Sequence, residues 1–207
     1  MTVRSRGGRR AASALLVAAL AAVALAQAPA PLEGKALLAK LRAGGVTLYF
    51  RHVATDFSQN DERYVEGDCA TQRNLTDAGR ADARRIGAEI KRLKIPIGEV
   101  RASPYCRTIE TAMLIFGRAD RAPEARGGPA VADADRYAEL AKLLATPSAP
   151  GTVRVISSHG NPFRAITQST YLQEGEAAVV APGPGDGFTV IARIPKDGWA
   201  TLDRERR

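Results

Sequence analysis

The sequence has few of the residues that bind metals or form cross-links, with two histidines and two cysteines among 207 residues. A metal site at either histidine would need further His, Cys or carboxylate ligands at close spacing, and neither histidine has a short-range partner of that kind. Runs of Lys and Arg with interleaved aromatic residues are lacking, which argues against nucleic-acid binding. There is no internal repeat. The two histidines are therefore the first candidates for functional residues.

Long apolar runs are lacking too. The longest, from Ala11 to about Ala24, is short and mildly hydrophobic beside the roughly 20 residues of a membrane-spanning helix. It is preceded by a basic stretch and followed by small residues suited to cleavage near Ala26 or Ala28. The basic residues are Arg4, Arg6, Arg9 and Arg10.

This pattern is typical of a secretory signal peptide. We predict that residues 1–28 are the signal and that residues 29–207 form a single domain, periplasmic or secreted. Arg9-Arg10 leaves the general and the twin-arginine export routes both open. No cysteine lies near the cleavage region, so we expect no stable membrane anchor after cleavage.

The net charge supports a small anionic partner. The full chain carries a formal charge of +8, and the first 28 residues hold four arginines and no acidic residue, so the remainder carries +4. A mildly positive protein attracts anionic small molecules.

Both histidines end short apolar stretches that are rich in β-branched residues. Val46 to Phe50 runs into Arg51-His52, and Val153 to Ser158 runs into His159. Each stretch predicts a buried strand, and open α/β sheets bind ligands at the carboxyl ends of their strands. The histidines are structural, or they hold a metal, or they form a covalent phosphoryl site in which one imidazole attacks phosphorus and arginines neutralise the oxygens.

A phosphoryl site predicts another arginine at the end of a third strand. Residues 98–103 indicate a short strand, Pro104 ends it, and an apolar helical pattern follows up to Gly117. Arg107 would lie in the first turn of that helix, where the free N–H groups and the positive end of the dipole favour an anion.

Three motifs together resemble those of the histidine phosphatase superfamily. They are Arg51-His52, the segment Ser103-Pro-x-x-Arg107-Thr-x-x-Thr111-Ala112, and Ser158-His159-Gly160-Asn161. The family usually has Arg-His-Gly at the first motif, and here Val53 replaces the glycine. The resemblance spans about residues 46–194 and includes the Leu-Thr-x-x-Gly-Arg start of a helix at residues 75–80.

The resemblance implies an α/β fold, a three-layer αβα sandwich with a mostly parallel central sheet, as in phosphoglycerate mutases. It also implies an enzyme that hydrolyses phosphomonoesters of small molecules, and the predicted signal peptide implies that this enzyme is exported. His52 would be the nucleophile that becomes phosphorylated, with Arg51, Arg107 and His159 holding the phosphoryl oxygens. Arg51 beside His52 would favour the neutral imidazole. No metal and no cofactor is implied.

The acid that protonates the leaving group is not evident from the sequence. Some superfamily members use an aspartate directly after the second histidine, where this chain has Gly160. Others use a glutamate after the second motif. Five glutamates are candidates, none of them stands out, and a surface carboxylate is the favoured explanation of each: Glu110, Glu124, Glu139, Glu174 and Glu176.

Cys69 and Cys106 are expected to form a disulfide in an exported protein. In the chain-entropy model such a bridge contributes about 4 kcal/mol. It would also hold the polar segment from Thr55 to Cys69 beside Arg107. That segment is either a solvated loop or a loop over the pocket that selects the substrate.

The other elements follow from apolar spacing and turn residues. We predict helices at Leu32–Ala43, from Thr76 to Leu93, at Asp135–Ala145 and from Pro162, and a strand pair at Glu176–Pro182 and Gly187–Ile194. Arg118 to Val131 lacks periodicity and predicts a surface loop. Trp199 and Leu202 are expected to pack on the domain, and Arg204–Arg207 to fray.

The sequence is also compatible with two alternatives to the phosphatase. A non-catalytic module of the cell envelope would use the same pocket to hold a phosphorylated ligand without turnover. A metal-dependent hydrolase would lose activity in the presence of chelators.

Overall fold

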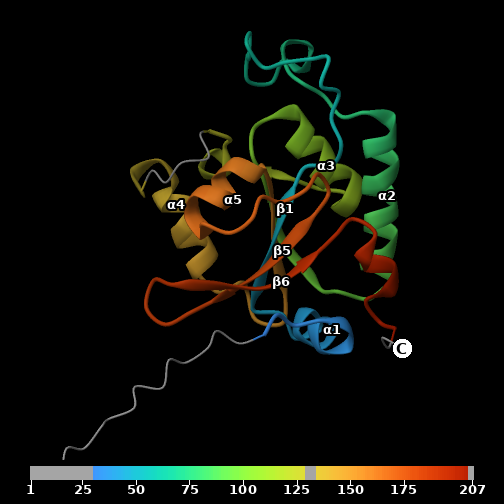
Figure 1. Ribbon diagram of the computed structural model, residues 1–207, viewed down its shortest axis with the longest axis vertical. Coiled ribbons are helices and arrows are strands. Elements are labelled where there is room, and N and C mark those ends of the chain that lie inside the picture. The colour runs from blue at the N-terminus through green and yellow to red at the C-terminus, as the bar shows by residue number, and fades with distance from the viewer. Residues whose placement is uncertain (1–29, 129–133, 205–207) are drawn as a thin grey trace, which may run out of the picture.

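A computed structural model describes residues 30–128 and 134–204. Figure 1 shows a central sheet with helices around it. The strands are β1 (Val46–Arg51), β2 (Ile97–Ala102), β3 (Asp120–Arg121), β4 (Val153–Ser158), β5 (Ala177–Pro182) and β6 (Phe188–Ile194). The helices are α1 (Gly34–Ala43), α2 (Asp77–Arg92), α3 (Cys106–Phe116), α4 (Ala134–Ala145) and α5 (Gly160–Thr167).

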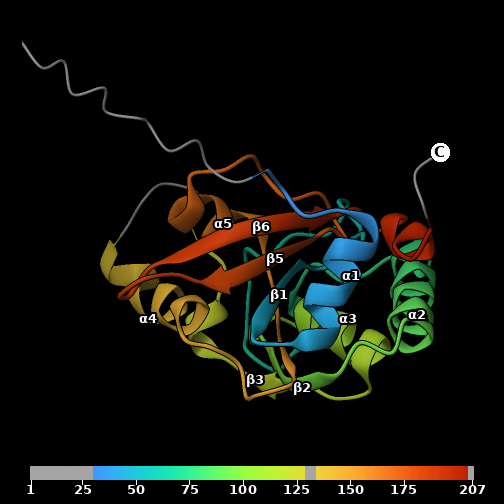
Figure 2. The same ribbon diagram turned by 90° about the horizontal axis from the view of Figure 1, so that it is seen from below.

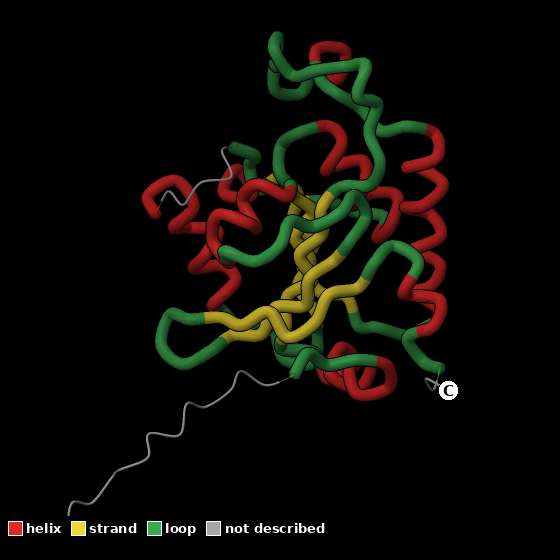
Figure 3. The backbone as a smooth tube through the Cα atoms, viewed as in Figure 1, coloured by secondary structure: helices red, strands yellow, loops and turns green. Residues whose placement is uncertain are grey.

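The sheet is mostly parallel, and its strands lie in the order β3-β2-β4-β1-β5-β6. Strand β4 pairs in parallel with both β1 and β2, and β3 pairs in parallel with β2. Strands β5 and β6 form the antiparallel hairpin expected at the sheet edge, which Figure 3 shows in yellow. The central position of β1 and β4 brings two strand ends that are distant in sequence together.

Helices cover both faces of this sheet because successive side chains of a buried strand point to opposite faces. Leu48 and Phe50 of β1 belong to one core cluster, with buried residues of α1, α2 and α3. Tyr49, between them, belongs to a second cluster with buried residues of α4 and α5. Figure 2 shows the two groups of helices on opposite sides of the strands. The predicted three-layer αβα fold is confirmed.

Helix α2 begins as its sequence predicts. The Thr76 side chain accepts a hydrogen bond from the backbone N–H of Gly79, and Asp77 occupies the first turn. A Cβ at Gly79 would overlap the carbonyl oxygen of Ala54. Glycine at this position therefore lets α2 pack directly against the segment that follows His52.

The predicted surface loop at residues 118–131 is wrong in part. Asp120–Arg121 form the edge strand β3, and a 3-10 turn follows at Pro123–Ala125. Ala122 is 1% exposed and Ala125 is fully buried. A two-residue strand is held by backbone hydrogen bonds and small alanines, so it leaves no periodic pattern. Residues 129–131 lie outside the described residues.

Near the two ends of the described chain, one predicted helix start shifts and the predicted packing of Trp199 is confirmed. Helix α1 begins at Gly34 rather than Leu32, whose backbone N–H instead donates to the Ile191 carbonyl at 2.8 Å. Trp199 is buried and stacks on Phe50, with ring centroids 5.8 Å apart. The predicted signal peptide and residues 205–207 lie outside the described residues. In the part that is described, no helix combines the length and the apolar character needed to span a membrane.

Candidate active site

The two histidines meet because β1 and β4 are neighbouring parallel strands. Arg51 pairs with Ser158 in the β1–β4 register, and His52 donates its backbone N–H to the Ser158 carbonyl at 3.0 Å. His52 and His159 each follow their strand by one residue. Their ring centroids lie 5.6 Å apart, with the planes at 71°.

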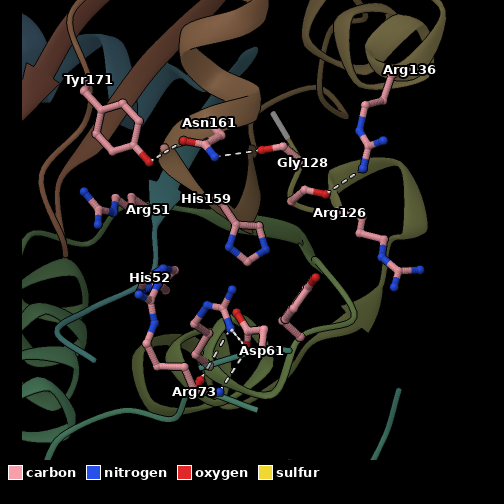
Figure 4. A pocket seen from close by; sticks show the side chains of 14 residues that line it. Arg51, His52, Asp61, Arg73, Arg126, Gly128, Arg136, His159, Asn161 and Tyr171 are labelled. Carbon is pink, nitrogen blue, oxygen red and sulfur yellow. Dashed lines mark hydrogen bonds and ion pairs between the residues drawn. The ribbon is translucent and has the colours of Figure 1, made fainter. Parts of the chain in front are cut away.

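Both imidazoles line one cavity of about 530 Å³, shown in Figure 4. They are nearly buried, with 2% of His52 and 6% of His159 exposed. The charged residues among the described part of the cavity wall are one aspartate, Asp61, and five arginines: Arg51, Arg73, Arg107, Arg126 and Arg136. Such a cavity suits an anion with several negatively charged oxygens.

His52 is held as a neutral imidazole with a defined tautomer. Burial, more than any neighbouring charge, lowers its pKa to about 3, and Arg107 and then Arg51 add to that effect. Its Nδ1 lies 2.9 Å from the Val53 carbonyl oxygen. Because a carbonyl oxygen only accepts, Nδ1 carries the proton and the lone pair is on Nε2. The neutral state expected from Arg51 is present, but burial is its main cause.

His159 is positioned from three sides. Its Nε2 forms a 2.8 Å hydrogen bond with Ser103 Oγ at the end of β2. The buried Tyr49 hydroxyl lies 2.9 Å from its carbonyl oxygen, and the Tyr105 ring meets its ring edge-on at 5.0 Å. Burial, followed by the nearby His52 and Arg107, keeps the pKa of His159 well below its usual value. The positive charge of the site therefore comes from the arginines.

Arg51 and Arg107 approach the histidines from different elements. Arg51 ends β1, donates from Nη1 to the Leu172 carbonyl at 2.8 Å and lies over the Tyr171 ring. Arg107, in the first turn of α3, donates from Nη1 to Asp61 Oδ1 at 3.0 Å and lies over the Tyr105 ring.

The buried Nε atoms of Arg51, Arg73 and Arg107 have no hydrogen-bond partner in the described part of the chain. Buried donors normally find an acceptor, and cationic donors bind phosphate oxygens strongly. Three such donors around two histidines indicate a site for a phosphoryl group.

A model of the histidine phosphatase superfamily (branch 1) matches residues 48–128, which include Arg51, His52 and Arg107. Over this stretch the chain is similar to the histidine phosphatase superfamily. A comparison with curated proteins finds no match. Among solved structures, a protein assigned as the phosphohistidine phosphatase SixA of Agrobacterium tumefaciens aligns over 73% of this chain and 98% of its own, with 13% identity and a TM-score of 0.51.

A mycobacterial glucosyl-3-phosphoglycerate phosphatase aligns over 72% of this chain and 95% of its own, with 14% identity and a TM-score of 0.51. At these identities the two alignments show a shared fold. His159 lies beyond the stretch that the family model matches, so its place in the site rests on the geometry described above.

None of the five candidate glutamates lines the cavity. Glu110 pairs with Arg80, Glu124 with Arg101 and Glu176 with Arg193, and Glu139 is exposed on α4. Glu174 Oε1 accepts from the Thr55 hydroxyl at 2.8 Å and lies 3.9 Å from His52 Nδ1, so it faces the protonated nitrogen rather than the nucleophilic one.

The position after the second histidine offers no acid either. A Cβ on Gly160 would overlap the ring of Tyr171. That ring lies beside Arg51, and its hydroxyl donates to Asn161 Oδ1 at 2.7 Å. Tyr171 therefore occupies the space that a side chain at position 160 would need.

The polar segment after His52 contributes to the cavity, which favours a pocket loop over a purely solvated one. Asp61 lines the cavity, whereas Phe57 and Val65 are exposed. Sequence reasoning singled out neither Asp61 nor Arg73, because no spacing or flanking pattern marks them. Only the tertiary structure brings them beside Arg107.

Cys69 and Cys106 form a disulfide. It joins this loop to the first residue of α3, next to Arg107. The Gln72 side chain reinforces the junction by accepting a hydrogen bond from the Cys106 backbone N–H at 2.9 Å. Within residues 30–128 and 134–204, no group of three or more His, Cys, Asp and Glu residues is arranged to hold a metal ion.

Proposed function

We propose that this chain is an exported phosphatase that hydrolyses phosphomonoesters of small molecules through a phosphohistidine on His52. The observation that carries the proposal is the state of His52. Its imidazole is neutral, its Nδ1 proton is engaged by the Val53 carbonyl, and its Nε2 lone pair is available. A neutral, oriented imidazole beside arginines is what nucleophilic attack on phosphorus requires.

In the first step Nε2 of His52 attacks phosphorus and the bond from phosphorus to the ester oxygen breaks. Arg51, Arg107 and His159 bind the phosphoryl oxygens, and the arginines stabilise the charge of the transition state. In the second step water attacks the phosphohistidine and releases inorganic phosphate. In this scheme the arginines supply the charge compensation, so we expect activity to persist in the presence of chelators.

The test is to trap the intermediate. Purified mature protein is mixed with an aryl phosphate, quenched rapidly without acid and analysed by mass spectrometry. We expect a phosphoryl group on His52, and loss of turnover in His52→Ala. Circular dichroism would verify that the variant is folded. Full activity in the folded variant would contradict the proposal.

The non-catalytic binding module remains the second candidate, because none of the expected glutamates lies in the cavity. Tight binding of phosphate, with no turnover and no phosphoryl group on His52, would favour it.

Export is the part of the proposal that rests on residues 1–28 alone. The test is to express the full chain and determine the N-terminus of the protein recovered from the periplasm or medium. Cleavage near residue 28 is expected. An intact N-terminus in the cytoplasm would contradict export and leave the phosphatase proposal unaffected.

A further inference from the structure

Asp61 is the one carboxylate among the described residues that line the cavity. Its Oδ1 accepts two hydrogen bonds, from Arg107 Nη1 at 3.0 Å and from the Arg73 backbone N–H at 2.9 Å. No described residue donates a hydrogen bond to Oδ2, and the side chain is 28% exposed. Figure 4 shows Asp61 below His159 in that view, with its interactions dashed. One oxygen is thus fixed, and the other is available to a ligand.

We propose that Asp61 is the proton donor to the leaving group, and that its carboxylate then activates the water that hydrolyses the phosphohistidine. This inference rests on the proposed phosphatase function. Asp61 shares Arg107 with the phosphoryl group of the proposed mechanism, so its carboxyl group lies one side chain away from the reacting phosphorus. No candidate glutamate lines the cavity, and position 160 has no room for a side chain.

The proton and the bonds balance over the two steps. The proton that Asp61 donates in the first step comes from solvent. As His52 Nε2 bonds to phosphorus, the ester oxygen leaves and receives the proton from Asp61. In the second step the Asp61 carboxylate takes a proton from water, whose oxygen bonds to phosphorus while the bond from phosphorus to Nε2 breaks.

Asp61 lies on a loop, but that loop is held on the site. The Cys69–Cys106 disulfide joins it to α3, and Tyr64 of the loop packs on Tyr105 with ring centroids 4.4 Å apart. The bond from the Arg73 N–H fixes the carboxylate from the other side. General acids act efficiently when they are held in place before the reaction.

A different role, in which Asp61 only orients Arg107, makes a different prediction. The substitution Asp61→Asn distinguishes the acid role from the orienting role. The asparagine amide oxygen can accept the same hydrogen bonds from Arg107 and Arg73, but the amide group cannot donate a proton to the leaving group. The matched control is Glu62→Gln, which removes the neighbouring carboxylate of the same loop from outside the cavity. Each protein is assayed with an aryl phosphate, whose phenol leaves without protonation, and with an alkyl phosphate, whose alcohol requires it.

For Asp61→Asn we expect kcat/KM to fall about 100-fold or more with the alkyl phosphate, and by less than about fivefold with the aryl phosphate. Phosphoryl-His52 should accumulate with the aryl phosphate, because hydrolysis of the intermediate loses its base. Glu62→Gln should match the unmodified protein with both substrates.

Equal losses with the two substrates, and no accumulation of the intermediate, would overturn the acid role and leave Asp61 as a positioning residue. In that outcome phosphoryl-His52 still forms in the unmodified protein, so the proposed function stands. Absence of phosphoryl-His52 from the unmodified protein would overturn both proposals.

Discussion

At the scale of single residues, the property that matters most is the neutral state of the buried histidines. An exposed imidazole beside a phosphoryl site is protonated in mild acid and ceases to be a nucleophile. Burial prevents this at His52, whose pKa falls to about 3. The same burial makes folding sensitive to acid, because an unfolded chain exposes both imidazoles to water.

We predict that the free energy of unfolding decreases as the pH falls below about 6.5 and continues to decrease towards pH 3. In this range unfolded histidine, with its usual pKa of 6.5, binds a proton that folded His52 does not bind, so protons favour the unfolded state. Each such histidine contributes a slope of about 1.4 kcal/mol per pH unit. Above pH 6.5 both states are neutral and the contribution vanishes.

Urea unfolding at a series of pH values measures this slope. His52→Gln should show a smaller decrease between about pH 6 and pH 4, because one of the two histidines is gone. Carboxylates lose their ion pairs in acid in both proteins, so the comparison isolates His52. Identical slopes would mean that the imidazole is protonated in the folded protein.

A site residue can be predicted from the sequence when it lies at the end of a regular element, and not when it lies in an irregular segment. Arg51, His52 and His159 follow apolar strands, and Arg107 follows a strand and a proline, so periodicity marks each of them. Asp61 and Arg73 lie in an irregular segment, and their role depends on contacts with α3. Propensity and spacing carry no information about such contacts. The five glutamates were candidates because of their residue type alone. In the structure each of them lies outside the cavity, in an ion pair, in a hydrogen bond or on the exposed surface.

At the scale of elements, the site is assembled by two pairings. The parallel pairing of β1 with β4 aligns the two histidines, and the disulfide joins the loop of Asp61 to α3. The sheet and five helices follow apolar patterns that the sequence displays. Strand β3 does not, because two residues and buried alanines give no period. The expected surface loop around it therefore concealed Arg126, Gly127 and Gly128, which line the cavity.

We predict that replacing both cysteines, Cys69→Ser with Cys106→Ser, lowers the free energy of unfolding by about 2–4 kcal/mol. The bridge joins cysteines that are 37 residues apart in sequence. Its loss therefore raises mainly the conformational entropy of the unfolded chain. The variant should also raise KM, because the loop that carries Asp61 and Arg73 is no longer fixed to α3. Chemical unfolding and steady-state kinetics measure the two effects.

Reducing agent provides the control for the disulfide. It should bring the unmodified protein to the stability and KM of the double variant and leave the variant itself unchanged. Equal stability of the oxidised and reduced proteins would show that the loop is held by its hydrogen bonds and the Tyr64–Tyr105 packing alone.

At the scale of the whole molecule, charge is concentrated where the substrate would bind. The chain without residues 1–28 has a modest formal charge of +4, yet five arginines line one cavity of about 530 Å³. A cavity lined mainly by charge of one sign, here five arginines against one aspartate, focuses its field and raises the local concentration of oppositely charged ligands. The sequence shows the net charge, but only the fold shows that these five arginines gather in one place.

We predict that kcat/KM for a phosphomonoester dianion falls as salt rises from about 0.01 M to about 0.15 M, where the Debye length shrinks from about 30 Å to about 8 Å. Arg126→Gln should make this dependence shallower, because Arg126 is an exposed arginine of the cavity wall. Arg84→Gln, an equal charge change on the exposed side of α2, should leave it unchanged. Equal effects of the two variants would mean that net charge, rather than the clustering of arginines at the cavity, attracts the substrate.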